Sequence, residues 1–88
     1  MFEVQWQPSA LDGLARIWMK AASAERQEIT AASRQLDNAL GSNPESQGES
    51  RELNERVVFA DPIGVRIVID HERSIVRVLK AWHIRRRF

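Results

Sequence analysis

The sequence predicts an α+β domain whose elements follow the order β-α-α-β-β-β. Three observations carry this prediction: strict apolar–polar alternation at residues 2–7, two apolar stripes of helical spacing within residues 9–40, and β-branched runs at 65–70 and 74–82. Since a strand and two helices precede three consecutive strands, we expect a helical hairpin packed on one face of a small antiparallel sheet.

Length and composition indicate a single soluble domain spanning residues 1–88. The chain has 43% hydrophobic and 28% charged residues and no cysteine, a balance typical of globular proteins. Without cysteine, neither disulfides nor thiolate metal sites can form. No apolar run approaches the roughly 20 residues of a membrane span and no secretory signal is recognisable, so we expect a cytoplasmic protein with no membrane contact.

The first strand is expected from the alternation of Phe2, Val4 and Trp6 with polar residues, and Pro8 should end it. One face of such a strand is buried, which places Trp6 in the core. Trp18 belongs to an apolar stripe of the following helix and is expected in the core as well.

Two helices are expected within residues 9–40, joined by very few residues. Ser9 should cap the first helix and Ser23 the second, while a left-handed Gly41 should end the second. Gly13 costs the first helix about 1 kcal/mol relative to alanine, so we expect a close crossing there. The two stripes comprise Leu11, Leu14, Ala15, Trp18 and Ala22, then Ile29, Ala32, Leu36, Ala39 and Leu40.

The pairing of the last two strands decides which charged side chains share a face. With a hairpin loop of two or four residues, Ile75 pairs with Asp70 and Leu79 lies opposite Arg66. Alternation then puts Arg66, Arg77 and His83 together on one face. The opposite face holds Val65, Ile67, Ile69, Val76, Val78 and Trp82, a coherent core interrupted only by Lys80.

Basic residues are concentrated at the end of the chain. Residues 1–56 carry six Lys/Arg and nine Asp/Glu, whereas residues 57–88 carry seven and three, and no acid follows residue 74. Such an asymmetry suggests a surface for phosphate or for an acidic protein. Arginine supplies a planar charged fork for phosphate and histidine titrates near neutrality, so Arg66, Arg77 and His83 could hold a phosphodiester and move a proton beside it.

Simpler interpretations compete with this one. Taken alone, Arg66 is an exposed arginine that keeps the surface of the sheet soluble, and His83 is a histidine at a strand end with no functional role. Residues 85–87 are then a solvated tail. Two histidines twelve residues apart, with no clustered acid, predict no metal site, and no cofactor is expected.

At these residues the chain resembles the toxins of type II toxin–antitoxin modules in the RelE/ParE superfamily. The likeness covers nearly the whole chain. The segment FEVQWQPSALDGLARIW resembles the opening of the family, GVRIVID its arginine-bearing strand, and VRVLKAWHIRRR its last strand and tail. The resemblance implies a helical hairpin on a small antiparallel sheet.

In the RelE-like branch the toxin cleaves messenger RNA in the ribosome, which stops translation. The resemblance then implies that Arg66 stabilises the scissile phosphate, that His83 acts as acid or base, and that Arg85 or Arg86 holds the flanking phosphate. Glu52 and Glu55 are the candidates for the base. The cations expected to bind nucleic acid are Arg56, Arg77, Lys80, Arg86 and Arg87. This chain lacks the C-terminal tyrosine of several such nucleases and has only two lysines.

Two other functions fit the same resemblance. In the ParE-like branch the toxin inhibits DNA gyrase by protein contact without catalysis, and a diverged homologue would bind an antitoxin without being toxic. The nuclease hypothesis requires Arg66 and His83 to share a solvent-open face, and it fails if the register separates them. In all three cases a cognate antitoxin is the expected partner, bound at the last strand and the groove beside the helical hairpin; ribosome and messenger RNA, or gyrase, are the expected targets.

Overall fold

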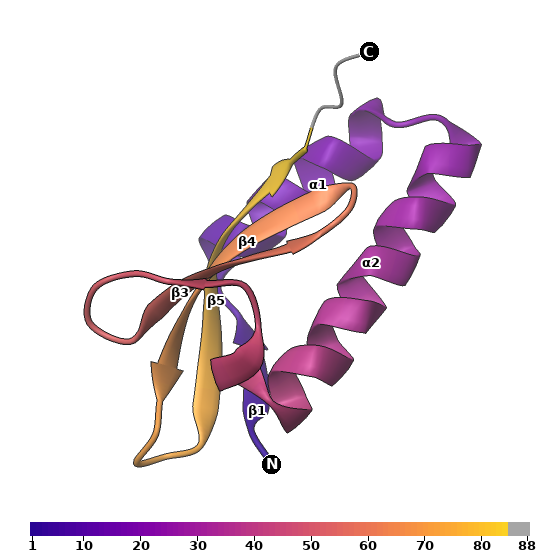
Figure 1. The fold of residues 1–88 in the computed structure, drawn as a ribbon. Helices are drawn as coiled ribbons and strands as arrows, with labels where there is room; N and C mark the ends of the chain where they lie inside the picture. Colours follow the sequence, from indigo (N-terminus) through magenta and orange to yellow (C-terminus); the bar gives the residue numbers. More distant parts are fainter. Residues whose placement is uncertain (85–88) are drawn as a thin grey trace.

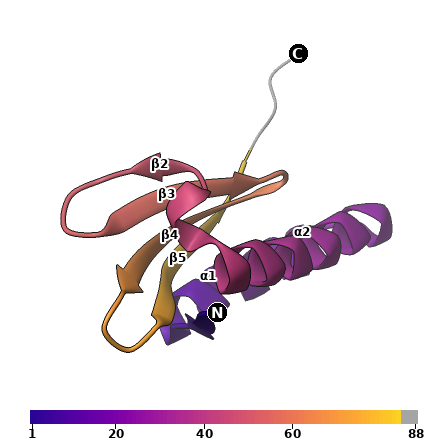
Figure 2. The ribbon, with the colours of Figure 1, turned by 60° about the horizontal axis from the view of Figure 1, so that its bottom comes forward.

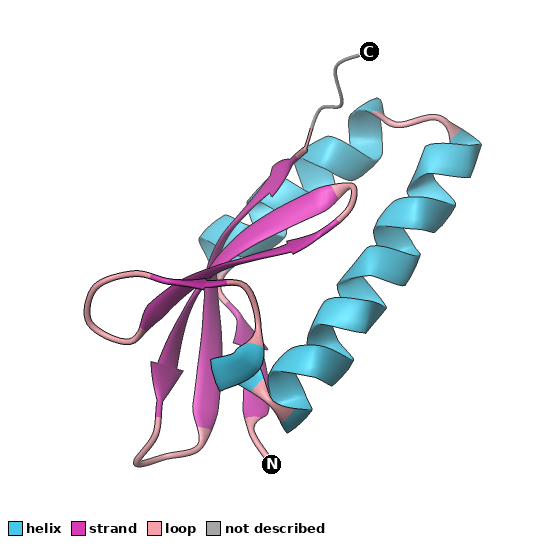
Figure 3. Ribbon diagram, viewed as in Figure 1, coloured by secondary structure: helices cyan, strands magenta, loops and turns pink. Residues whose placement is uncertain are grey.

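The computed structural model describes residues 1–84 and confirms the α+β class (Figure 1). Along the chain the elements are β1 (Glu3–Trp6), α1 (Pro8–Lys20), α2 (Ser23–Ser42), the 3₁₀ turn η1 (Pro44–Ser46), β2 (Glu49–Ser50), β3 (Glu55–Ala60), β4 (Ile63–Asp70) and β5 (Ile75–His83). Both helices cover one face of a five-stranded sheet in the order β1-β5-β4-β3-β2 (Figures 2 and 3). Neither helix combines the length and apolar character needed to cross a membrane.

The sheet is mixed rather than antiparallel. β2 to β5 pair antiparallel as predicted, whereas β1 runs parallel to β5, with Glu3 opposite Ile75 and Trp6 opposite Val78. The last strand therefore lies between β1 and β4 and is not the exposed edge that was expected. The edges of the sheet are β1 and β2.

The helix termini differ from the predicted caps. Gln7, in extended conformation, precedes α1, and Pro8 is its first residue, a position where its missing N–H is not needed. The prediction of Ser9 as a cap is wrong, because its Oγ donates instead to the Leu79 carbonyl oxygen at 2.6 Å. Ala22, not Ser23, precedes α2.

The end of α2 also departs from expectation. Gly41 lies inside the helix, which continues to Ser42. Its carbonyl oxygen accepts a hydrogen bond from the Phe2 backbone N–H at 2.7 Å, which fixes the start of β1 to the helix. Gly41 is therefore not the left-handed terminator that the sequence suggested; among residues 1–84 the glycine with positive φ is Gly48, at 60°.

The core lies between α2, the start of α1 and the inner face of the sheet. The stripe predicted for α2 is confirmed at its main positions, with Ile29 and Leu36 at 1% exposure. The buried residues of this core are Ala10, Ala21, Ile29, Ala32, Leu36, Leu40, Val58, Ala60, Ile63, Val65, Ile67, Ile69, Val76, Val78 and Ala81. Val57 is also buried, but it lies on the other face of the sheet, opposite Arg66. Trp6 packs against this core, and its indole N–H donates to Asp37 Oδ1 of α2 at 2.7 Å.

Trp18, by contrast, is 40% exposed, so the prediction that it lies in the core is wrong. The face of α1 that meets the sheet contains Ala10, with Leu14 and Ile17 partly buried beside it. Trp18 and Leu11, which belong to the predicted stripe, are 40% and 50% exposed, so only part of that stripe is buried.

Gly13 explains how closely α1 approaches the sheet. A Cβ at this position would collide with the carbonyl oxygen of Ala81 in β5. The expected close crossing is confirmed, although the crossing element is a strand and not a second helix. Helix α1 thereby lies along the part of β5 that β1 does not pair with.

A β-bulge changes the register of the last two strands. Asp70 pairs with Ile75 as predicted, but an irregularity at Arg66 and Ile67 leaves Leu79 extra, so Arg66 faces Lys80. Without this bulge Lys80 would point into the core, where an unpaired ammonium is strongly disfavoured. The bulge exposes Lys80 and buries Ala81 instead, at 9% exposure.

Candidate functional site

The side of the sheet that faces away from the helices, called the open face here, carries three of the four Lys and Arg residues that were predicted for the site and lie within residues 1–84. Residues directly opposite each other on neighbouring strands share a face. Three rows cross β3, β4 and β5 on this side: Phe59–Gly64–Trp82, Val57–Arg66–Lys80 and Glu55–Val68–Arg77. The structure therefore brings Arg66, Arg77 and Lys80 together on one surface.

Arg66 lies at the centre of the open face. Its side chain is half exposed, and its Nε lies 3.7 Å from Glu55 Oε1 on β3. Lys80 lies opposite Arg66 on β5 and makes no ion pair with any residue of the described chain. This arrangement offers two cations to a bound phosphate, with one carboxylate beside them.

Arg77 is held at the other end of the open face by Asp70. Its Nη1 lies 3.5 Å from Asp70 Oδ2, and the Arg73 guanidinium lies 3.3 Å from the same oxygen. The Arg73 backbone N–H donates to Asp70 Oδ1 at 3.1 Å. This backbone hydrogen bond, and after it the two guanidinium groups, lower the pKa of Asp70 below its usual 3.8, against the opposing effect of desolvation.

The lowered pKa of Asp70 predicts a pH-dependent contribution to stability. Because the carboxyl binds its proton less tightly in the folded chain, its contribution is complete above about pH 4 and is lost as the pH falls through the folded-state pKa. We expect Asp70→Asn to be less stable than the parent chain in urea at pH 7, with the difference narrowing towards pH 2. The control Glu72→Gln removes an exposed carboxylate of the same turn; a difference for Asp70→Asn that is constant with pH would contradict the prediction.

His83 lies on the other side of the sheet. It pairs with Ile63, a residue of the buried face, and its Nε2 lies 3.3 Å from Glu25 Oε2 near the start of α2. Figure 1 shows this end of β5 on the same side of the molecule as the connection between α1 and α2. The sequence placed His83 beside Arg66; this placement is wrong, because the bulge inserts one residue between them and so inverts the alternation beyond it.

A cleft of about 1010 Å³ opens next to His83, between the two helices and the end of the sheet. Its walls carry charges of both signs, from Arg16 and Lys20 on α1 and from Glu25 and Glu28 on α2. Asp61 and Pro62, in the turn between β3 and β4, complete it. The imidazole of His83 therefore faces protein carboxylate and not the cations of the open face.

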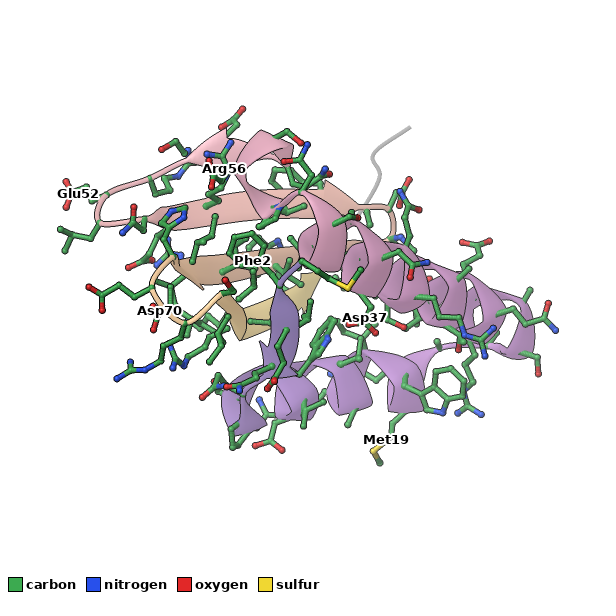
Figure 4. The ribbon with its side chains drawn as sticks, turned by 90° about the horizontal axis from the view of Figure 1, so that it is seen from below. Phe2, Met19, Asp37, Glu52, Arg56 and Asp70 are labelled. Carbon is green, nitrogen blue, oxygen red and sulfur yellow. The ribbon has the colours of Figure 1, made fainter. Side chains whose placement is uncertain are left out.

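The remaining predicted residues are scattered. Glu52 is exposed at the tip of the loop between β2 and β3 (Figure 4), four positions before the strand residue Arg56. Arg56 donates to the carbonyl oxygens of Gln47 and Gly48, at 2.6 and 3.2 Å, so it fastens the preceding loop. Arg85, Arg86 and Arg87 lie outside the described residues.

Comparison with known proteins identifies the fold. No family model matches the sequence, and no curated protein matches it by sequence. Among solved structures, the chromosomal ParDE TA system from P. aeruginosa aligns with a TM-score of 0.74 at 12% identity, covering 97% of this chain and 98% of that one. The chain also aligns with the RelBE2 toxin–antitoxin complex of Mycobacterium tuberculosis, with a TM-score of 0.70 at 18% identity, covering 93% of this chain and 90% of that one. With the isolated E. coli RelE toxin the TM-score is 0.63 at 16% identity, and the alignment covers 99% of this chain and 88% of that one.

The chain has the fold of the RelE and ParE toxins.

Sequence reasoning missed two groups of surface residues on this RelE/ParE fold. On the open face, Phe59 is 55% exposed and its ring meets that of Trp82 edge to face, with centroids 6.4 Å apart. On α1, Leu11 and Met19 are exposed together with Trp18; Figure 4 shows Met19 pointing away from the body of the protein. The exposure of Phe59 could have been read from its place between buried Val58 and Ala60, whereas Trp82 depends on the bulge.

Proposed function

We propose that this chain is the toxin of a type II toxin–antitoxin module and that it inhibits DNA gyrase by protein contact, without catalysing a reaction. The toxin assignment is supported by the fold shared with a ParDE system and with RelE toxins, together with the sequence motifs. The choice of mechanism is carried by one observation: His83 and Arg66 lie on opposite faces of the sheet.

RNA cleavage by attack of a 2′-hydroxyl needs a base, an acid and positive charge around the phosphate. Within residues 1–84 the open face supplies the charge through Arg66 and Lys80. Its carboxylate nearest to Arg66, Glu55, is engaged with that guanidinium at 3.7 Å, and no imidazole accompanies it. An inhibitor that acts by contact needs no acid–base pair.

The exposed apolar side chains of α1 favour a protein target. Trp18 is 40% exposed, Leu11 50% and Met19 75%, although large apolar side chains are usually depleted from a surface without a partner. Aromatic residues of this kind contribute most of the energy in many protein interfaces. The helical side of the molecule therefore suits contact with a target.

Messenger RNA cleavage is the second candidate, and the presence of one carboxylate, Glu55, on the same face as Arg66 and Lys80 favours it. In that case Glu55 would take the proton of the 2′-hydroxyl, and the 2′-oxygen would bond to phosphorus as the bond from phosphorus to the 5′-oxygen breaks. Water would protonate the leaving 5′-oxygen, while Arg66 and Lys80 neutralise the phosphate. His83 would have no part in the reaction, which differs from the role that the sequence suggested.

A cognate antitoxin is part of the proposal. The exposed last strand expected for its binding is interior, because β1 covers one side of β5. Two kinds of binding site remain for the antitoxin. One is the cleft between the helices and the end of the sheet, which corresponds to the predicted groove beside the helical hairpin. The other is an edge strand of the sheet, β1 or β2.

Pulse-labelling of bacteria after induction of the chain tests the mechanism. We expect thymidine incorporation to fall at least several-fold while methionine incorporation continues, and we expect Arg66→Ala to leave this effect intact. A rapid fall of methionine incorporation that Arg66→Ala abolishes would overturn gyrase inhibition in favour of RNA cleavage. No effect on either label would leave a diverged protein that binds an antitoxin.

A further inference from the structure

We propose that the exposed face of α1 pairs with the same face of a second copy of this chain, the two helices running antiparallel about a two-fold axis near Ala15. This inference goes beyond the proposed function, because self-association needs neither gyrase nor an antitoxin. It rests on the exposure of α1, on the spacing of its apolar side chains, and on two charged side chains that form no ion pair among residues 1–84.

The outer face of α1 is apolar and exposed. The helix directs Ala10, Leu14 and Ile17 towards the core. On its other side Leu11 is 50% exposed and Met19 75% exposed, and Figure 4 shows Met19 pointing away from the body of the protein. Large apolar side chains gathered on one side of a helix are typical of an interface.

The apolar positions of this face are symmetric about Ala15. Leu11 precedes Ala15 by four residues and Met19 follows it by four, so the three side chains lie on one side of the helix. With a two-fold axis at Ala15, Leu11 of each copy lies opposite Met19 of the other. The small side chain of Ala15 at the crossing allows the helix axes to approach to about 8 Å. The face therefore fits a second copy of itself.

Two charged residues of opposite sign flank this face. Asp12 and Arg16 are exposed, line the same small pocket beside β5, and form no ion pair among residues 1–84. In an antiparallel pair Asp12 of one copy lies within about one helical turn, roughly 5.4 Å, of Arg16 of the other. The axis repeats this contact, which gives two identical ion pairs. A parallel pair would instead bring each charge next to its own kind, so the charges favour the antiparallel arrangement.

A hollow beside the face can take an apolar side chain of the second copy. It lies between α1 and α2, has a volume of about 340 Å³, and its walls include Leu14, Trp18 and Ile29. Trp18, 40% exposed, borders it and is held there by the Arg26 guanidinium, 5.5 Å from the ring centre. Docking of a second copy would remove this apolar surface from water.

The cations around the face limit the affinity. Lys20 on α1 and Arg26 and Arg34 on α2 carry the same charge in both copies and repel one another. A contact made by one helix of each copy is also smaller than the roughly 800 Å² per partner of a stable interface. We therefore expect a Kd of about 10–100 µM, so that the chain is monomeric when dilute and dimeric where it accumulates.

Pairing would also regulate the inhibition of gyrase, and this consequence rests on the proposed function. The dimer covers the exposed side chains of α1 that are proposed to contact gyrase, Leu11, Trp18 and Met19. A chain held in the dimer should therefore not inhibit supercoiling. The monomer, which predominates at low concentration, remains the inhibitory form.

Sedimentation velocity of the full chain between about 1 and about 500 µM tests self-association. Asp12→Arg and Arg16→Asp should each weaken it about tenfold or more, because like charges then meet across the axis. An equal mixture of the two variants should associate at least as well as the parent chain, since each supplies the charge that the other lacks. Changes within one chain cannot produce this recovery. Arg34→Asp, the control on α2, should not weaken self-association.

A cysteine at the axis gives a second test. The chain has no cysteine, so Ala15→Cys introduces a single thiol. Oxidised glutathione takes two electrons and two protons from a pair of these thiols, which form one disulfide, and becomes two reduced glutathione molecules. Because a disulfide needs Cα atoms within about 7 Å, we expect Ala15→Cys to be linked about tenfold faster than Ala24→Cys, at an exposed alanine of α2.

The disulfide-linked dimer tests the regulatory consequence. It should inhibit supercoiling at least about tenfold less than the same variant after reduction. Equal inhibition by the oxidised and reduced forms would overturn the regulation. If neither form inhibits gyrase, the proposed function fails, whereas the sedimentation experiment still decides self-association.

Three results would overturn the pairing itself. They are a parent chain that stays monomeric at about 500 µM, charge variants that do not associate when mixed, and equal rates of linkage for Ala15→Cys and Ala24→Cys. Circular dichroism checks that each variant is folded, as the exposure of the replaced side chains predicts. A monomeric chain would leave the face of α1 to a helix of another protein, for which the surrounding cations favour an acidic sequence.

Discussion

Gly13→Ala should destabilise the fold by about 2 kcal/mol, although the same substitution by itself favours a helix. Alanine gains about 1 kcal/mol over glycine inside a helix. At Gly13, however, the new Cβ would collide with the Ala81 carbonyl oxygen of β5, and a backbone atom held in a sheet cannot move aside as a side chain does. Overpacking of this kind costs about 3 kcal/mol, so the collision decides the sign.

Gly41→Ala is the matched control, and it should have the opposite effect. Gly41 lies within α2, and a Cβ there would stand at ordinary contact distances, 3.5 Å from the Phe2 carbonyl oxygen and 3.9 Å from Val4 Cγ2. We expect a gain of about 0.5 kcal/mol. For a domain of this size the two variants should differ in Tm by about 10 °C or more, measured by thermal denaturation.

The two glycine variants also separate the structure from the sequence-based expectation. Had Gly41 been a left-handed helix terminator, alanine would have been strained there and would lower the Tm. A lowered Tm for Gly41→Ala, or a raised one for Gly13→Ala, would contradict the packing described above.

The fold class was predictable because patterns within single elements determine it. The alternation at Phe2, Val4 and Trp6 and the stripe of Ile29, Leu36 and Leu40 each need only one strand or one helix. Their burial in the structure follows from hydrophobic periodicity alone. The parallel pairing of β1 with β5 was not predictable in this way, since it depends on where two helices return the chain.

The candidate site was less predictable, because one extra residue in β5, Leu79, decides which side chains belong to the site. The sequence pattern already contained the reason for the bulge, since Lys80 interrupted an otherwise apolar face. Two solutions were open, a lysine tolerated at the edge of the core or an extra residue in the strand. The structure has the second, and everything beyond Leu79 changes side, which separates His83 from Arg66 and brings Trp82 to Phe59.

Trp18 shows a different limit of sequence reasoning. A helix with an apolar stripe wider than its buried face predicts either a larger core or a binding surface, and periodicity does not distinguish them. Here β5 covers only the face around Ala10, and the Arg26 guanidinium lies 5.5 Å from the centre of the Trp18 ring, with its Nε donating to the Trp18 carbonyl oxygen at 2.9 Å. The indole is therefore held in place at the surface without being buried.

If the chain inhibits gyrase as proposed, Trp18→Ala should abolish most of that inhibition while leaving the fold intact. Truncating a central aromatic residue of an interface costs about 2–4 kcal/mol of binding free energy, which is roughly a 30- to 1000-fold loss of affinity. The stability should change by no more than about 1 kcal/mol, because the side chain is 40% exposed and loses mainly its contact with Arg26. The loss of affinity is measured as the change in the concentration of purified chain that half-inhibits DNA supercoiling by gyrase. The change in stability is measured by thermal denaturation.

Phe59→Ala is the matched control for Trp18→Ala, since it removes a comparably exposed aromatic residue from the opposite side of the molecule. If the helical side contacts gyrase, Phe59→Ala inhibits supercoiling as the parent chain does. If instead Phe59→Ala abolishes inhibition and Trp18→Ala does not, the target contact lies on the open face. The exposed stripe of α1 would then have to serve another partner, for which the proposed antitoxin is the first to examine.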